Sequence, residues 1–139
     1  MNSIVNLSEA FSMALHGVAM IAAVPEGSPV TARAIADRLG VSEAHLSKVL
    51  GRLTRSRLLK SSRGPGGGFA LGRPAVSIRL LDIYESVEGP LIINDCIMGT
   101  KVCCGEDCIF EDLIHNLNAE FKDYLERTSL DEVKDTLKE

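Results

Sequence analysis

Four cysteines in the last third of the chain follow the pattern C-x6-C-C-x3-C: Cys96, Cys103, Cys104 and Cys108. Soft thiolates of this kind bind iron–sulfur clusters, zinc or copper(I). Structural zinc sites usually pair their cysteines as C-x2-4-C, and Cys96 has no such close mate. Three spaced thiolates on a glycine-containing loop can instead surround a larger iron–sulfur cluster, with a weaker oxygen or nitrogen donor as the fourth ligand.

Reduced unligated thiols, a thiol–disulfide switch and a zinc site are the competing interpretations of these cysteines. Because Cys103 and Cys104 are adjacent, they cannot easily bind the same iron, so we expect one ligand and one spare, although Cys104 could supply a fourth ligand. The sequence shows no secretory signal and no apolar run of about eighteen residues, which predicts a cytoplasmic chain without membrane contact. An enzyme is not favoured, since no nucleotide motif or oxyanion loop is present.

The net charge of −4 conceals a basic middle segment. Residues 31–79 carry ten Lys/Arg and two Asp/Glu, a net charge of +8, whereas the rest of the chain carries five and seventeen, a net charge of −12. A basic segment inside an acidic chain is typical of a module that binds a polyanion such as DNA. A solvated basic face is the alternative.

Apolar spacing predicts helices over residues 6–23, with Asn6 as cap, and from Thr31 to Leu39, with the break PEGSP between them. Gly40 permits a left-handed turn and Ser42 caps a third helix. Together they give the sequence pattern of a helix–turn–helix motif. In such a pair the second helix enters the major groove. Its outward positions are Glu43, His45, Ser47, Lys48, Arg52 and Arg55.

The next stretch predicts a glycine-rich β-hairpin, the wing of a winged helix. Residues 58–62 and 69–73 form its strands, and RGPGGG, residues 63–68, forms its turn. Arg63 at the tip is suited to a narrow minor groove. A surface hairpin with an incidental arginine is the alternative.

A further helix is predicted over residues 78–87, followed by the cysteine loop and a long helix from about Phe110. Ser129 and Glu132 form a capping box that opens a short terminal helix. The long helix has an apolar stripe that needs a partner, and a symmetric homodimer is the simplest solution, unless the stripe packs on its own domain. The stripe consists of Phe110, Leu113, Ile114, Leu117, Phe121, Tyr124 and Leu125.

Several stretches together resemble a known family: MALHGVAMIA, AIADRLGVSEAHLSKVLGRL, SRGPGGGFALGR, IRLLDIYESVEGPL and TSLDEV. They are similar to the IscR/NsrR/CymR family of bacterial winged helix–turn–helix transcription regulators, and the cysteine loop looks like that of the cluster-bearing members. The resemblance implies a mainly α fold with a small β-hairpin wing. It also implies a DNA-binding domain over residues 1–90, a cluster loop over 91–109, and a dimerisation helix with a tail over 110–139.

Carried over residue by residue, the resemblance implies contacts to a double-stranded DNA operator and ligands to an iron–sulfur cluster of the 2Fe–2S or 4Fe–4S type. The cluster ligands fall on Cys96, Cys103 and Cys108. Candidates for the fourth ligand are Cys104, Glu111, His16 and Ser12. The DNA contacts fall on Ser42, Ala44, His45, Ser47, Lys48 and Arg63, to which the outward face of the helix adds Arg52.

We therefore predict a homodimeric DNA-binding regulator, expected to act as a repressor, that senses redox state, nitric oxide or iron through a cluster. One alternative is the same winged-helix regulator without a cluster, using a thiol switch or zinc. A redox or metal-handling protein without specific DNA binding would explain the cysteines but not the basic segment or the wing.

Overall fold

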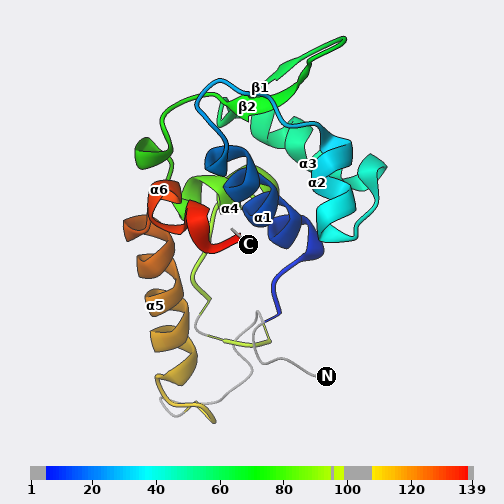
Figure 1. The fold of residues 1–139 in the computed structure, drawn as a ribbon. Coiled ribbons are helices and arrows are strands. Elements are labelled where there is room, and N and C mark those ends of the chain that lie inside the picture. The colour runs from blue at the N-terminus through cyan, green and yellow to red at the C-terminus, as the bar shows by residue number, and fades with distance from the viewer. Residues whose placement is uncertain (1–5, 95, 99–107, 138–139) are drawn as a thin grey trace.

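The computed structural model describes residues 6–94, 96–98 and 108–137. These residues form a mainly helical fold with one two-stranded sheet (Figure 1). The elements in chain order are α1 Glu9–Ala23, α2 Ala32–Leu39, α3 Glu43–Arg55, β1 Leu59–Ser62, β2 Gly68–Leu71, the 3-10 turn η1 Ala75–Ser77, α4 Leu80–Glu88, α5 Leu113–Arg127, α6 Leu130–Val133 and η2 Lys134–Leu137.

Three helices begin later than the sequence predicted, and one of them is α4, which starts at Leu80 rather than Ile78. Helix α1 starts at Glu9 because Ser8, and not Asn6, is its cap: the Ser8 hydroxyl oxygen accepts a hydrogen bond from the backbone N–H of Phe11 at 3.0 Å. Helix α5 starts at Leu113 rather than near Phe110. The preceding Glu111 has a positive φ of 49°, a left-handed conformation that no α-helix continues.

Helix α1 lies at the centre of the fold and packs on α2, α3 and α4 (Figure 1). Gly17 is buried where α1 meets Ile35 of α2 and Leu50 of α3. Both partner side chains are fully buried, as is Phe11 one and a half turns earlier. One apolar core built from these helices therefore supports the helix–turn–helix, and a Cβ on Gly17 would make only an ordinary contact with it.

The wing is an antiparallel pair in which Leu59 lies opposite Leu71 and Ser62 opposite Gly68. A third segment joins its base: Val30 exchanges two backbone hydrogen bonds with Phe69, both 2.8 Å long. Since Val30 directly precedes the cap of α2, this bridge fixes the wing relative to the helix–turn–helix.

The end of the described chain returns to the core. The Leu130 N–H donates to the carbonyl of Ile78 at 2.8 Å, and the Leu130 side chain is fully buried. Ser129 and Glu132 form the predicted capping box that opens α6. Within the described residues no helix combines the length and apolar character needed to cross a bilayer.

Candidate nucleic-acid interface and cysteine segment

The turn between α2 and α3 has the geometry of a helix–turn–helix. Gly40 ends α2 with φ 67° and ψ 36°, and the Val41 N–H donates to the carbonyl of Ala36 at 3.1 Å. The Ser42 hydroxyl oxygen then accepts from the His45 N–H at 3.3 Å, which caps α3. The predicted roles of Gly40 and Ser42 in shaping this turn are therefore confirmed.

Helix α3 presents one polar side and buries the other. Ala44, His45 and Lys48 are exposed near its amino end, as is the capping Ser42, whereas Ser47 is half-buried. Leu46 and Leu50 face the core on the opposite side. The structure thus brings most of the predicted DNA contacts together on the first two turns of α3, where a recognition helix reads base edges.

Arg52 differs from the other predicted DNA contacts. It is exposed, but its guanidinium Nη1 donates to the backbone carbonyl of Val87, at the end of α4, at 3.1 Å. This contact could not be predicted from the sequence, because Arg52 and Val87 are far apart along the chain.

The wing projects from the body beside α3 (Figure 1), and Arg63 is exposed at the start of its turn. The turn is closed by a hydrogen bond from the Gly67 N–H to the carbonyl of Gly64 at 2.9 Å. Gly68 has φ 142°, and a Cβ on it would lie 2.7 Å from the carbonyl oxygen of Val30. Gly68 is therefore required by the packing of the wing base against Val30, whether or not the wing also approaches DNA.

Cys96 and Cys108 are half-buried in the segment between α4 and α5. Cys103 and Cys104 lie outside the described residues. In the described ranges no three His, Cys, Asp or Glu side chains lie together as a metal-binding group. Thiolates of cysteines suit a soft metal or an iron–sulfur cluster. Of the three predicted cluster ligands, Cys96 and Cys108 are described and Cys103 is not.

The candidate fourth ligands occupy different settings. His16 is half-buried on α1, and its Nδ1 lies 2.7 Å from the backbone carbonyl of Ser12. A carbonyl only accepts, so Nδ1 carries the proton and Nε2 of the neutral ring retains the lone pair that a metal requires. Ser12 is exposed on α1, and Glu111 is exposed in the turn where its N–H donates to the carbonyl of Cys108.

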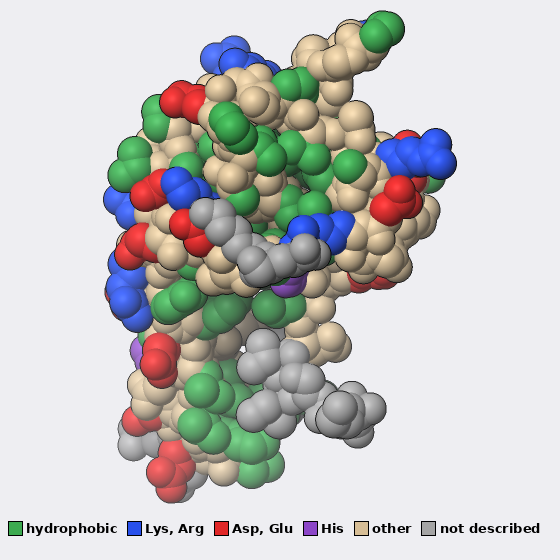
Figure 2. Space-filling model, in the orientation of Figure 1, with side chains coloured by type: hydrophobic (Ala, Val, Ile, Leu, Met, Phe, Trp, Pro, Cys, Tyr) green, Lys and Arg blue, Asp and Glu red, His purple; other side chains and the backbone are tan. Residues whose placement is uncertain are grey.

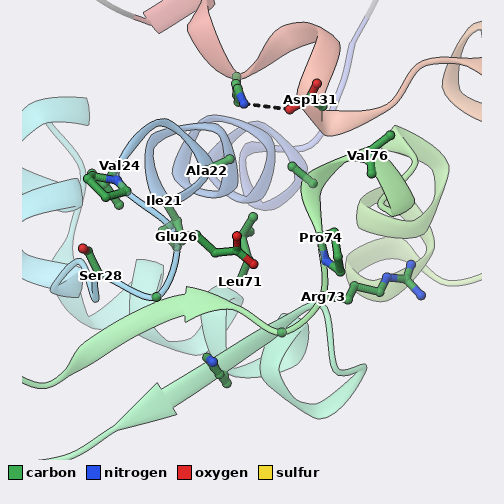
Figure 3. A pocket seen from close by; sticks show the side chains of 16 residues that line it. Ile21, Ala22, Val24, Glu26, Ser28, Leu71, Arg73, Pro74, Val76 and Asp131 are labelled. Atoms are coloured by element: carbon green, nitrogen blue, oxygen red, sulfur yellow. Dashed lines mark hydrogen bonds and ion pairs between the residues drawn. The ribbon is translucent and has the colours of Figure 1, made fainter.

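A hollow of about 630 Å³ lies between the end of α1, the base of the wing, η1 and α6 (Figure 3). Its charged lining is largely paired: Lys134 contacts Asp131 at 2.7 Å, and Arg73 contacts Asp82 at 2.8 Å. Within the described residues no buried polar side-chain atom lacks a hydrogen-bond partner. The hollow therefore offers a ligand no unsatisfied buried group.

Part of the α5 stripe packs inward, and part does not. Leu125 is buried, and the ring of Phe121 meets Tyr84 of α4 edge to face at 6.4 Å. Hydrophobic side chains gather on the surface where α5 begins (Figure 2). The exposed members of the stripe are Phe110, Leu113, Leu117 and Tyr124, which are 40–53% exposed.

Comparison with known proteins identifies the family. A family model described as "Rrf2: Iron-dependent Transcriptional regulator" matches residues 7–136. A helix–turn–helix transcriptional regulator of Neisseria meningitidis serogroup A is 37% identical over 102 residues, which are 72% of this chain and 68% of that protein. The regulator IscR of Pectobacterium carotovorum is 33% identical over 106 residues, 76% of this chain and 64% of IscR.

The fold has a solved counterpart in CymR, the global cysteine regulator of Bacillus subtilis. The TM-score is 0.78 at 24% identity, over 96% of this chain and 98% of CymR. This likeness confirms the predicted winged-helix architecture, and the family confirms a regulator rather than an enzyme. The chain belongs to the Rrf2 family of DNA-binding transcription regulators.

Proposed function

We propose that the protein is a homodimeric repressor that binds a roughly palindromic operator and senses redox state, nitric oxide or iron through an iron–sulfur cluster. The observation that carries this proposal is the position of the cysteine segment in the chain. It connects α4, which packs on the recognition helix α3, to α5, whose apolar side is exposed. A change in that segment can therefore act on the DNA-binding and dimer elements together.

The DNA contacts follow from charge and exposure. Lys48 and His45 on α3 and Arg63 on the wing lie on two projecting elements, suited to the major groove and the adjacent minor groove. Exposed arginines elsewhere in the basic segment add phosphate contacts, which supply affinity without sequence information. Ala44 contributes a small methyl surface that suits a thymine methyl group.

A second copy of the chain is the proposed occupant of the exposed α5 face. Leu113, Leu117 and Tyr124 recur along one side of α5, and Phe110 in the turn before the helix is also exposed. A self-complementary helix face generates a two-fold dimer. A two-fold dimer places two α3 helices on successive half-sites of one operator.

The ligands of the cluster would be Cys96, Cys103 and Cys108, with His16, Glu111, Ser12 or Cys104 as the fourth. The family description as iron-dependent regulators supports iron. His16 has geometric support, because its hydrogen bond to Ser12 leaves Nε2 with the lone pair. When bound, a cluster supplies a redox-active group that reactive oxygen or nitrogen species can change or remove.

A thiol switch without a cluster is the second candidate. Cys108 is a half-buried thiol, and such a thiol can be oxidised where solvent or an oxidant reaches it. A solved structure of the same fold, CymR of Staphylococcus aureus, is described in an oxidized form.

Anaerobic purification followed by a visible absorption spectrum, iron and sulfide assays and operator titration tests the first candidate. We expect iron and sulfide in the wild type, their loss in the Cys96→Ala and Cys108→Ala variants, and an operator affinity that differs between cluster-loaded and cluster-free protein. A colourless protein after anaerobic reconstitution would exclude the cluster and leave the thiol switch. Equal operator affinity in both states would exclude cluster sensing.

A further inference from the structure

The carboxyl end of α4 joins three parts of the molecule directly before the cysteine segment. Arg52 of α3 donates from Nη1 to the Val87 carbonyl at 3.1 Å. Ser8, the cap of α1, donates its hydroxyl proton to the Glu88 carboxylate. The Leu91 N–H, at the start of the segment, donates to Oε1 of Glu85 at 3.2 Å.

The bond from Arg52 has a clear physical basis. The last carbonyls of an α-helix lack partners within the helix and carry the negative end of its dipole. A guanidinium there satisfies one carbonyl with a charge-assisted hydrogen bond. The contact is half-buried, so water competes with it less than at an open surface.

The chain leaves this junction in a constrained geometry. Gly89 has φ 87°, which favours glycine, and its N–H closes the helix on the carbonyl of Glu85 at 3.0 Å. Five described residues follow, and the carbonyl of the last, Asn94, accepts from Nδ2 of Asn118 on α5 at 2.6 Å. Residues 91–94 are thus held by α4 at one end and by α5 at the other.

We infer that Arg52 is a positioning residue that couples residues 91–94 to the orientation of α3, in place of the direct DNA contact that its sequence position suggested. The inference rests on the proposed function in taking α3 as the reading helix. A displacement of residues 91–94 shifts Val87, because only the turn at Gly89 separates them. The Arg52 guanidinium, which is bonded to the Val87 carbonyl, transmits that shift to α3. By linkage, DNA bound to α3 must stabilise the end of α4 to the same degree.

Amide hydrogen exchange measured by mass spectrometry on the peptide 86–94 tests this coupling, with the full chain free and saturated with a duplex selected from a random-sequence pool. In the wild type we expect DNA to slow exchange in this peptide. Arg52→Gln should abolish that protection and raise exchange in the DNA-free protein about tenfold, the effect of losing one charged hydrogen bond. Arg55→Gln removes the same charge from an exposed position of the same helix and should retain the protection.

A second variant separates positioning from charge. Arg52→Lys keeps the cation but not the planar fork of donors, so we expect DNA affinity close to that of the wild type with the protection still reduced. Protection that persists in R52Q, or that is absent in DNA-bound wild type, would overturn the coupling while the DNA-binding function stands. If no duplex binds the wild type, the proposed function fails. Separately, if the peptide 86–94 exchanges its amide hydrogens equally fast in DNA-free R52Q and R55Q, the role of Arg52 is overturned.

Discussion

Replacing Gly68 by alanine should destabilise the whole fold through the base of the wing. The residue has φ 142°, and the added Cβ would lie 2.7 Å from the carbonyl oxygen and 2.8 Å from the carbonyl carbon of Val30. These are backbone atoms, so no side chain can swing away. The segment must move, and the two 2.8 Å hydrogen bonds between Val30 and Phe69 would be lost or stretched.

The expected cost follows from these two effects. A non-glycine residue held in a disfavoured backbone region costs about 1 to 3 kcal/mol, and each lost backbone hydrogen bond costs about 0.5 to 1.5 kcal/mol. We therefore expect Gly68→Ala to lower the free energy of unfolding by about 2 to 6 kcal/mol, a large part of the total stability of a typical domain.

Urea denaturation followed by circular dichroism measures this change, and Gly17→Ala is the matched control. Gly17 lies inside α1, and its added Cβ would make an ordinary contact 3.5 Å from Cδ2 of Leu50. Alanine is the better helix former, so this variant should be stabilised by about 1 kcal/mol. A Gly68→Ala protein within about 0.5 kcal/mol of the wild type would refute the account of the wing base.

Three further predictions concern DNA binding, assembly and pH. Lys48→Ala should weaken DNA binding and, if the ammonium contacts a phosphate, reduce the slope of log affinity against log salt by about one in an anisotropy titration; an unchanged slope argues against a phosphate contact. Leu117→Glu should convert a dimer to monomers in sedimentation velocity, whereas Glu120→Gln on an exposed position of α5 should not; a dimer that survives L117E would place the interface elsewhere. The hydrogen bonds from the backbone N–H and hydroxyl of Ser129 lower the pKa of Glu132, so its stabilising effect is present above its ordinary pKa and is lost as the pH falls through the lowered value. Glu132→Gln should therefore flatten the acid limb of the stability curve in thermal melts, and an unchanged limb would contradict the capping role.

Local patterns in the sequence were sufficient for the elements that depend on neighbouring residues. Gly40 and Ser42 defined the helix–turn–helix because a left-handed turn and a cap need particular residue types at fixed offsets. The capping box of Ser129 and Glu132 was readable for the same reason. The basic segment and the cysteine spacing were likewise properties of the chain itself, and they indicated DNA and a soft metal or thiol chemistry before any fold was known.

The tertiary structure decided what depends on residues far apart along the chain. Ser8 rather than Asn6 caps α1, and Ser8 also reaches Glu88, a partner that only folding brings near. Val30 joins the wing through a bridge to Phe69. A bridge of one residue has no alternating apolar pattern, so it could not be predicted from the sequence. The direction of Arg52 is the clearest case: the sequence placed it on the polar side of α3, and the unpaired carbonyl at the end of α4 turned it toward Val87, because a helix end is satisfied by whichever donor packing places beside it.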